Sequence, residues 1–243
     1  FRLEILDWIA KDPDPETASL LGKWLAENNE TELRKSFSGF LEFGTAGLRG
    51  PVRPGPSGMN RAVVGRTAAG IAAFLISRGL SKIIIGRDAR HGSLEFAQES
   101  AEIFSGAGLE VHLLPRELPT PVLAFAVNEL KMDCGIMVTA SHNPAIDNGY
   151  KVYLGGAIDG IVYRGSQIIA PVDSDISKRM RKAVEKLGST YIKLGQIISS
   201  GEGLFPTELV DEFKLCRDQV PAESFADVRK VVEHDLGTSI EDV

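Results

Sequence analysis

An alternation of helical and strand-like segments between residues 60 and 138 constrains the fold of this chain more than any other feature of its sequence. Apolar residues recur there at helical spacing in three segments, and short apolar runs typical of buried strands lie after them. The helical segments are 60–79, 93–106 and 120–130, and the apolar runs are 82–85, 111–114 and 134–138. This pattern predicts the α/β class, with a doubly wound, mostly parallel sheet and helices on both of its faces.

Residues suited to helix ends support this division. Asn60 and Ser93 are the expected N-caps of the first two helices, because their side-chain oxygens can accept a hydrogen bond from a backbone N–H of the first turn. Pro121 should lie in the first turn of the third helix, where the N–H that proline lacks would have no partner inside the helix.

The N-terminal residues 1–42 are expected to form a helical extension that packs on the sheet domain. Their apolar residues predict a first helix that breaks at Asp-Pro-Asp-Pro (residues 12–15) and a second helix that begins near Thr17 and continues to Phe37. The two tryptophans of this segment lie at helical spacing, which favours packing in a core over contact with a ligand.

The C-terminal part of the chain is less regular. Residues 155–160 include three glycines and are expected to form a turn-rich loop. A helix capped at Ser174 should follow, and another should cover 207–215. We expect the α/β domain to span residues 43–205 and a second, incomplete domain to begin within 206–243.

Composition places the chain among ordinary globular proteins, with 43% hydrophobic and 25% charged residues. No apolar run reaches the roughly 20 residues that a membrane span needs, and no secretory leader is apparent, so we expect a cytoplasmic protein. The net charge of −6 argues against a nucleic-acid partner or an anionic membrane, since both select basic surfaces. The two cysteines, Cys134 and Cys216, lie in a predicted strand and a predicted helix and indicate neither a disulfide framework nor a metal site.

Ser141 follows the strand at 134–138 and should lie at its carboxyl end, where open α/β sheets place their sites. It belongs to the string Val-Thr-Ala-Ser-His-Asn-Pro, and Asp-Asn-Gly-Tyr-Lys then brings Lys151 into the same segment. Asn143 and Pro144 fix a turn, so Ser141 is expected on a rigid bend. An imidazole, a carboxamide and an ammonium group around one hydroxyl suit the transfer of a negatively charged group. A polar turn without function is the plainer alternative.

A glycine-rich segment at residues 43–50, Phe-Gly-Thr-Ala-Gly-Leu-Arg-Gly, is suited to approach an anion closely. Glycine exposes backbone N–H groups, and the planar guanidinium of Arg49 matches the oxygens of a phosphate. A simple turn is the alternative, because glycine-rich strings form turns more often than binding sites.

Three charged residues, Arg87, Asp88 and Arg90, follow the strand at 82–85 and should share the sheet edge with Ser141. They either contact a ligand or brace their own loop through an ion pair, and the sequence leaves both alternatives open. The histidines outside the serine segment are scattered, and His112 is expected at the surface or in the core rather than in a ligand site.

Two parts of the sequence resemble the α-D-phosphohexomutase family. The phosphoserine loop of that family is similar to the strings Thr-Ala-Ser-His-Asn-Pro and Asn-Gly-Tyr-Lys, and its N-terminal glycine segment is similar to residues 43–50. This family includes phosphoglucomutases, phosphomannomutases and phosphopentomutases. The helical extension and the spelling of the glycine segment are most similar to the phosphoglucomutase-2 and phosphopentomutase-like branch. The resemblance covers roughly residues 40–220, which is the amino-terminal portion of such a protein.

The resemblance implies a phosphosugar mutase, which moves a phosphoryl group between C1 and C6, or C5, of a sugar phosphate through an active-site phosphoserine. Sugar monophosphates and bisphosphates would be its partners. The implied catalytic residues are Ser141, His142, Lys151 and Arg49, and the implied substrate-binding residues are Thr45, Asn143 and Arg87. Ser141 would carry the phosphoryl group, with acid–base and charge-stabilising neighbours around it.

Family members use a divalent metal ion, normally Mg²⁺, and the phosphate on Ser141 would be one of its ligands. The other ligands come from an Asp-Gly-Asp-x-Asp-Arg loop, and this sequence does not contain that string; the segments at 12–14 and 173–175 lack its glycine and its third aspartate. A hard cation gathers about six oxygen ligands. We therefore expect the chain to be part of a longer mutase and to be inactive alone.

Two other functions remain open. A non-catalytic module with only the first domain would bind phosphosugars without converting them. A serine hydrolase would need a Gly-x-Ser-x-Gly elbow or a histidine from elsewhere in the chain, and neither is apparent around Ser141. The sequence leaves the identity of the sugar and the oligomeric state open.

Overall fold

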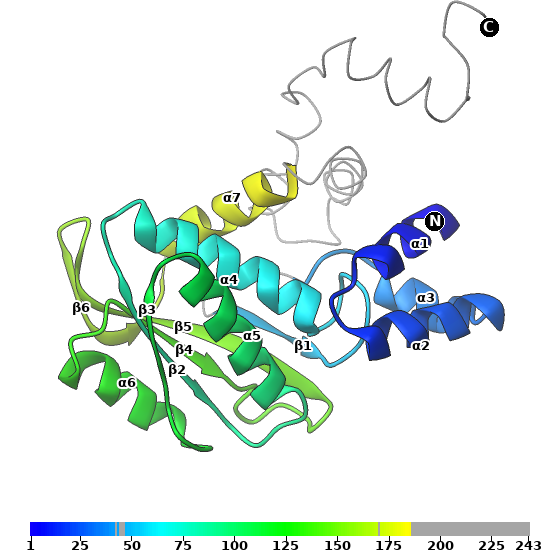
Figure 1. Cartoon of the computed structure of the whole chain (residues 1–243). Coiled ribbons are helices and arrows are strands. Elements are labelled where there is room, and N and C mark those ends of the chain that lie inside the picture. Colours follow the sequence, from blue (N-terminus) through cyan, green and yellow to red (C-terminus); the bar gives the residue numbers. More distant parts are fainter. Residues whose placement is uncertain (42, 44–46, 170, 186–243) are drawn as a thin grey trace, which may run out of the picture. The chain divides into compact units, whose positions relative to one another are not determined.

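The computed structural model describes residues 1–41, 43, 47–169 and 171–185 (Figure 1). The predicted helix at 207–215 and the predicted second domain at 206–243 lie outside these residues, as does Cys216, so these expectations stay predictions. Within the described residues, no helix combines the length and the apolar character that crossing a membrane requires.

Between residues 60 and 138 the described elements alternate as the sequence predicted. In chain order the described elements are α1 (Arg2–Lys11), α2 (Pro15–Ala26), α3 (Glu30–Ser36), β1 (Gly47–Pro51), α4 (Arg61–Ile76), β2 (Lys82–Arg87), α5 (Ser93–Gly106), β3 (Glu110–Leu113), α6 (Thr120–Glu129), β4 (Cys134–Val138), β5 (Asp147–Ile158), β6 (Ile161–Gln167) and α7 (Val172–Glu185).

The strands form one sheet in the order β1-β5-β4-β2-β3, with β6 paired to the C-terminal half of β5. β2 lies between β3 and β4 and runs parallel to both. These three strands are the ones that the alternation predicted, and their parallel pairing confirms that prediction. β5 runs antiparallel to β4, β1 and β6, so the chain returns beside β4 directly after the Ser141 segment.

Helices cover both faces of the sheet, as predicted (Figure 1). Alternate residues of β2 point to opposite sides: Ile83 and Ile85 join a core with residues of α4, α5 and α7, whereas Ile84 joins a second core with residues of α6. Both cores consist of side chains that are almost completely buried. Burial of this apolar surface holds the three layers together.

The N-terminal extension contains three helices where the sequence predicted two. After α2, Asn28 takes a left-handed φ of 53°, and the side chain of Asn29 caps α3 by accepting a hydrogen bond from the N–H of Glu32. Leu21 and Leu33 lie on either side of this break and are buried in the same core. The apolar pattern therefore continues across the break, and this is why the sequence predicted a single helix there.

The tryptophans of the extension are core residues, as predicted. Trp8 is buried, with the ring of Phe37 at its edge and the guanidinium of Arg66 over its face. Trp24 packs against the same core, which the extension shares with α4 and the sheet. The extension thus packs on the sheet domain, while its predicted boundary at residue 42 stays a prediction.

Of the N-caps predicted for α4 and α5, the first is confirmed and the second is wrong. Oδ1 of Asn60 accepts a hydrogen bond from the N–H of Val63 at 3.0 Å and caps α4. The N-cap of α5 is Gly92, with a left-handed φ of 77°, and Ser93 is the first residue of the helix. The hydroxyl of Ser93 is buried and donates to Asp88 at 2.7 Å, so it serves the preceding loop rather than the helix end.

A β-hairpin replaces the loop predicted at 155–160. β5 continues through most of this segment, and β6 pairs with it after a two-residue turn. Asp159 and Gly160 form the turn with positive φ values of 51° and 81°, the geometry that tight hairpins favour. The following helix, α7, begins at Val172, before its predicted cap Ser174.

Gly135 in β4 lets α6 approach the sheet closely. A Cβ atom at this position would lie 2.3 Å from Cγ2 of Val127 and 3.6 Å from the side chain of Leu123. Protein interiors are packed too densely to absorb such an overlap without movement of the neighbouring atoms. The α6 layer therefore depends on the missing side chain.

We expect Gly135→Ala to lower the free energy of unfolding by about 1–3 kcal/mol, because the added methyl group overpacks the contact with α6. Val127→Ala removes the atom that the methyl group would meet. The double variant should therefore lose less free energy of unfolding than the two single variants lose together. Chemical denaturation of the four proteins measures this coupling, and strictly additive losses would contradict the packing described.

Candidate active site

Ser141 lies just beyond the carboxyl end of β4 with an exposed side chain, at the sheet edge that the sequence predicted. Its backbone has a left-handed φ of 57°, which a residue other than glycine adopts rarely and at a cost of about 1–3 kcal/mol. Its N–H donates to Oγ1 of Thr139 at 3.0 Å. The hydroxyl is therefore held on a defined bend.

The return strand β5 brings Lys151 to Ser141. Lys151 lies opposite Met137 of β4, and its Nζ donates to Oγ of Ser141 across 2.6 Å. Burial, and after it the positive charge of Arg49, lowers the pKa of Lys151. A lysine with a lowered pKa is more often neutral and can accept the proton of a neighbouring hydroxyl.

β1 brings Arg49 from the glycine-rich segment to the same place. Arg49 lies opposite Gly149 in the register of β1 and β5, and its Nη1 donates to Oδ1 of Asn143 at 3.3 Å. Nδ2 of Asn143 in turn donates to Oδ2 of Asp147 at 3.0 Å. In a chain of net charge −6, Arg49 and Lys151 concentrate positive charge locally, as binding of an anion requires.

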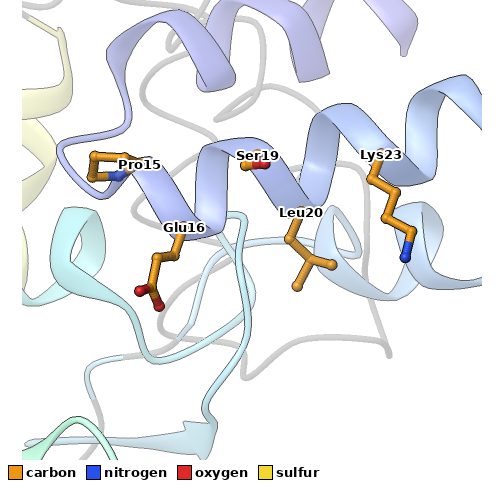
Figure 2. Close-up of a pocket in the computed structure, with 5 residues that line it drawn as sticks. All are labelled: Pro15, Glu16, Ser19, Leu20 and Lys23. Carbon is orange, nitrogen blue, oxygen red and sulfur yellow. The ribbon is translucent and has the colours of Figure 1, made fainter.

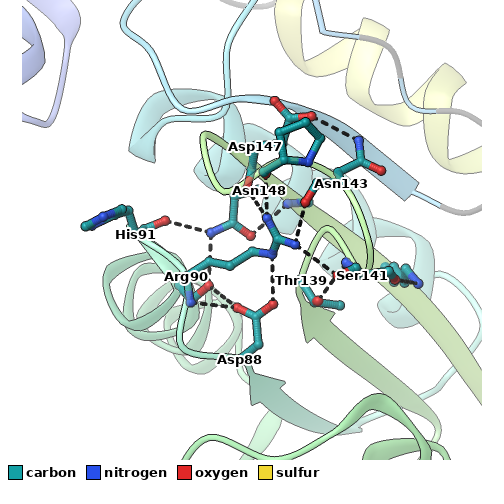
Figure 3. A network of polar contacts seen from close by, with 12 residues as sticks. Asp88, Arg90, His91, Thr139, Ser141, Asn143, Asp147 and Asn148 are labelled. Atoms are coloured by element: carbon teal, nitrogen blue, oxygen red, sulfur yellow. Dashed lines mark hydrogen bonds and ion pairs between the residues drawn. The ribbon is translucent and has the colours of Figure 1, made fainter.

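Arg90 braces the loop that carries Ser141 (Figure 3). Its two terminal nitrogens donate to four backbone carbonyl groups. The acceptors are the carbonyl oxygens of Ser141, Asn143, Pro144 and Asp147, at 2.9, 2.8, 2.7 and 3.0 Å. The remaining N–H, at Nε, faces Oδ2 of Asp88 across 3.3 Å. Because a guanidinium has five N–H donors, the structure supports bracing, rather than ligand contact, for Arg90 and Asp88.

The other predicted site residues are Arg87, His142 and Thr45, and the first two lie within the described part of the chain. Arg87 ends β2 and forms an ion pair with Glu117, and its predicted contact with substrate stays a prediction. The exposed ring of His142 follows Ser141 in the chain. Thr45 lies outside the described residues.

His112 is a surface residue, which is one of the two positions that the sequence predicted for it. It lies on β3, and its Nε2 is 2.8 Å from a carboxylate oxygen of Glu110. The role predicted for His142, inside the serine segment, stays a prediction.

Asn148 is a site residue that the sequence analysis did not single out. It is fully buried, and its amide donates to the carbonyl of His91 at 2.8 Å and to the hydroxyl of Ser93 at 2.9 Å. Its Oδ1 accepts the N–H of Gly149 at 2.7 Å. This side chain joins the start of β5 to the start of α5. The sequence did carry a signal for this role, since Asn148 directly precedes strand-forming residues. A polar side chain buried there needs hydrogen-bond partners from other segments.

The described residues do not by themselves fit a divalent metal ion. The carboxylates of the network, Asp88 and Asp147, already accept hydrogen bonds from protein groups. Among the residues that the structure describes, no three His, Cys, Asp or Glu side chains are grouped to hold a metal. The cationic side chains next to Ser141 suit an anion instead. Mg²⁺ with the phosphate of Ser141 as a ligand stays a prediction.

Two surface hollows are formed by other residues. The first has a volume of about 520 Å³ and lies along α2 (Figure 2). Its lining residues are Pro15, Glu16, Ser19, Leu20 and Lys23. The second, of about 460 Å³, is lined by Arg34, Lys35, Ser38, Pro51, Arg53 and Ser57. Neither hollow includes a residue of the Ser141 network, so the candidate site is defined by its chemistry rather than by these hollows.

Comparisons with known proteins agree on one family. Residues 41–185 match the model of the phosphoglucomutase/phosphomannomutase α/β/α domain I. The chain is 50% identical over 128 residues to a probable phosphomannomutase of Haemophilus influenzae, which covers 51% of this chain and 25% of that protein. It is 38% identical over 192 residues to the phosphopentomutase of Homo sapiens, which covers 75% of this chain and 30% of the relative.

A solved structure shows the same fold. It is a protein of Thermus thermophilus, provisionally described as a phosphomannomutase, with a TM-score of 0.52 and 28% identity. The similarity covers 66% of this chain and 38% of that one, so the chain spans well under half the length of each protein compared. The matched residues 41–185 contain the whole Ser141 network and more than half of the chain. The resemblance seen in the sequence is confirmed, and the chain belongs to the phosphoglucomutase/phosphomannomutase family through its α/β/α domain I.

Proposed function

We propose that this chain supplies the phosphoryl-carrying domain of a phosphosugar mutase and that Ser141 takes up and releases the phosphoryl group. The observation that carries the proposal is the 2.6 Å contact between Nζ of Lys151 and the exposed Oγ of Ser141. A hydroxyl becomes a nucleophile when a base within hydrogen-bond reach takes its proton. Family membership supports the same role for the serine.

In the uptake step, Oγ of Ser141 attacks a phosphorus atom of a sugar bisphosphate. The Oγ–P bond forms while the P–O bond to the sugar breaks, and the hydroxyl proton passes to Lys151. The sugar oxygen leaves as a hydroxyl group after it takes a proton, which we assign to the neighbouring His142. Arg49 offsets the charge of the phosphoryl oxygens. The release step reverses these bond changes toward a different hydroxyl of the sugar.

The proposed overall reaction moves a phosphoryl group between C1 and C6, or C5, of a sugar phosphate. Relatives of this chain are named for mannose and pentose phosphates, so the proposal leaves the sugar open. The proposed partners are sugar monophosphates and bisphosphates, and the proposed location is the cytoplasm. A net charge of −6 fits small anions bound at a local cationic site better than it fits a nucleic acid.

We further propose that the chain by itself carries the phosphoryl group without completing the mutase cycle. The comparison proteins are several times longer than the segment they share with this chain. The described residues include groups that suit phosphoryl uptake, but their carboxylates do not assemble a metal site. The proposed Mg²⁺ would share the phosphate of Ser141 with ligands from elsewhere in the full protein and would withdraw charge from the moving phosphoryl group.

We expect the chain to gain one phosphoryl group on Ser141 when it is incubated with glucose 1,6-bisphosphate. Intact-protein mass spectrometry and peptide mapping locate the modification. Ser141→Ala should gain none, and Ser19→Ala, which changes an exposed serine of α2, should behave as the unchanged protein. A chain that never acquires phosphate would favour the non-catalytic binding module, and labelling of Ser141 by a fluorophosphonate would favour a serine hydrolase.

We expect Lys151→Arg to slow phosphoryl uptake by about 10²- to 10⁴-fold, although it keeps the positive charge, because a guanidinium does not give up its proton. In the unchanged protein the uptake rate should rise on the acid side of its pH profile as the Lys151 ammonium loses its proton, and it should fall again where the proton donor to the sugar oxygen is lost. Because the folded pKa is lowered, the midpoint should lie below the ordinary value of about 10.4.

Rapid-quench measurements across the pH range in which histidine and lysine titrate test this assignment. The rising limb should be absent in Lys151→Arg. Its persistence in that variant would assign the serine proton to another acceptor, with His142 as the first candidate.

A further inference from the structure

We propose that Arg90 is a positioning residue for phosphoryl transfer, which fixes the Ser141 hydroxyl against Lys151 before a substrate arrives. Arg90 belongs to the connection between β2 and α5 and is distant in sequence from the loop that it holds. The inference rests on the proposed function of Ser141, although its effect on the loop can be measured separately.

Four carbonyl groups of the Ser141 loop converge on the guanidinium of Arg90. The oxygens of Ser141, Asn143, Pro144 and Asp147 all lie 2.7 to 3.0 Å from the terminal nitrogens of Arg90 (Figure 3). Four carbonyl dipoles that point at one place repel each other unless a donor lies between them. The loop can therefore keep this shape only while the guanidinium is in place, and a lysine, with three donors, cannot replace it.

Arg90 is itself held in place by Asp88 of the same connection. Oδ1 of Asp88 accepts the backbone N–H of Arg90 at 3.0 Å and the hydroxyl of Ser93 at 2.7 Å, and Oδ2 faces Nε of Arg90. Ser93 and Asn148 are buried and hydrogen-bonded to each other. The brace thus extends from the exposed loop into the core beside α5.

The backbone of Ser141 adopts an uncommon conformation next to Arg90. Its left-handed φ is unfavourable for a serine, and Arg90 binds the carbonyl group of that same residue. This backbone conformation sets the direction of the Cα–Cβ bond that carries the hydroxyl. A loop released from Arg90 would relax toward commoner conformations and move Oγ away from Lys151.

The arrangement also predicts which kinetic quantity Arg90 controls. Four of the five N–H donors of Arg90 bond to carbonyl groups of the protein, and Nε is paired with Asp88, so the guanidinium is occupied by protein partners. It should therefore affect the rate of transfer and leave the binding of the sugar bisphosphate unchanged. Arg49 differs, because among the described residues the loop engages it through Nη1 and Asn143 alone.

The test compares Arg90→Lys with Arg78→Lys in the 243-residue chain. The two arginine side chains are similarly buried, at 16% and 19% exposure, and both form ion pairs. The partners of Arg78 are Asp159 and Asp175, which lie outside the Ser141 loop. Arg78→Lys therefore controls for the loss of a largely buried guanidinium.

Single-turnover uptake of phosphate from glucose 1,6-bisphosphate is measured over a range of concentrations. Arg90→Lys should lower the maximal rate about 10²-fold with an unchanged half-saturating concentration, because a small displacement of a reacting atom costs that much. Arg78→Lys should change neither quantity. A raised half-saturating concentration with an unchanged maximal rate would show that Arg90 binds substrate and would overturn the proposal.

Amide hydrogen exchange gives a readout that does not depend on phosphorylation. The N–H groups of Asn143 and Asp147 bond within the loop, to the carbonyls of Ala140 and Pro144. They should exchange faster in Arg90→Lys and not in Arg78→Lys. Should Arg90→Lys fail to fold, Asp88→Asn keeps the arginine, weakens its hold and should show smaller changes in the same direction.

The two readouts separate the two claims. If the unchanged chain takes up no phosphate, the proposed function of Ser141 fails, while hydrogen exchange still reports whether Arg90 fixes the loop. Exchange at Asn143 and Asp147 that is unaltered in a folded Arg90→Lys or in Asp88→Asn overturns the positioning role.

Discussion

The pairing of β5 between β4 and β1 is the constraint on which the rest of the site depends. Because β5 returns antiparallel beside β4, a residue ten positions after Ser141 comes back to within hydrogen-bond distance of its hydroxyl. β1 then adds Arg49 from a distant part of the sequence. The register allows no slip, since a shift of one residue would turn Lys151 to the opposite face of the sheet. Close approach at Gly149, where a Cβ would lie 2.6 Å from the carbonyl oxygen of Thr139, fixes the same register.

The charged groups around Ser141 form two sets. One set holds the loop in its shape, and the other lies next to the Ser141 hydroxyl and the loop surface without bracing the backbone. Arg90 and Asp88 are saturated by protein partners and serve the loop's shape. In the proposed function, Lys151, with its lowered pKa, and Arg49 would lie where the phosphoryl group develops charge. Preorganised groups of this kind stabilise transferred charge without rearranging during the reaction. This division explains how the Ser141 loop can be held rigid while positively charged side chains of β1 and β5 lie next to it.

Sequence reasoning succeeded where a local pattern decides the structure. The parallel strands, the helices on both faces, the cap at Asn60 and the position of Ser141 all follow from periodicity, capping and chain order. It failed where tertiary partners decide. Ser93 has the chemistry of a cap, but Asp88 engages its hydroxyl, and the glycines near residue 155 belong to a hairpin that α6 and β4 support. The choice between bracing and ligand contact for Arg90 required the positions of four carbonyl groups that no sequence motif encodes.

The most direct measurement is an NMR titration of the Lys151 side chain, in protein labelled at its lysines and with the signal assigned through Lys151→Met. We predict a midpoint below the ordinary value of about 10.4, because burial and Arg49 both oppose the charged form. In Arg49→Met the midpoint should move upward and still remain below the ordinary value, since the effect of burial persists. An ordinary midpoint in the unchanged chain, or one that Arg49→Met leaves in place, would contradict the view of Lys151 as the base for Ser141.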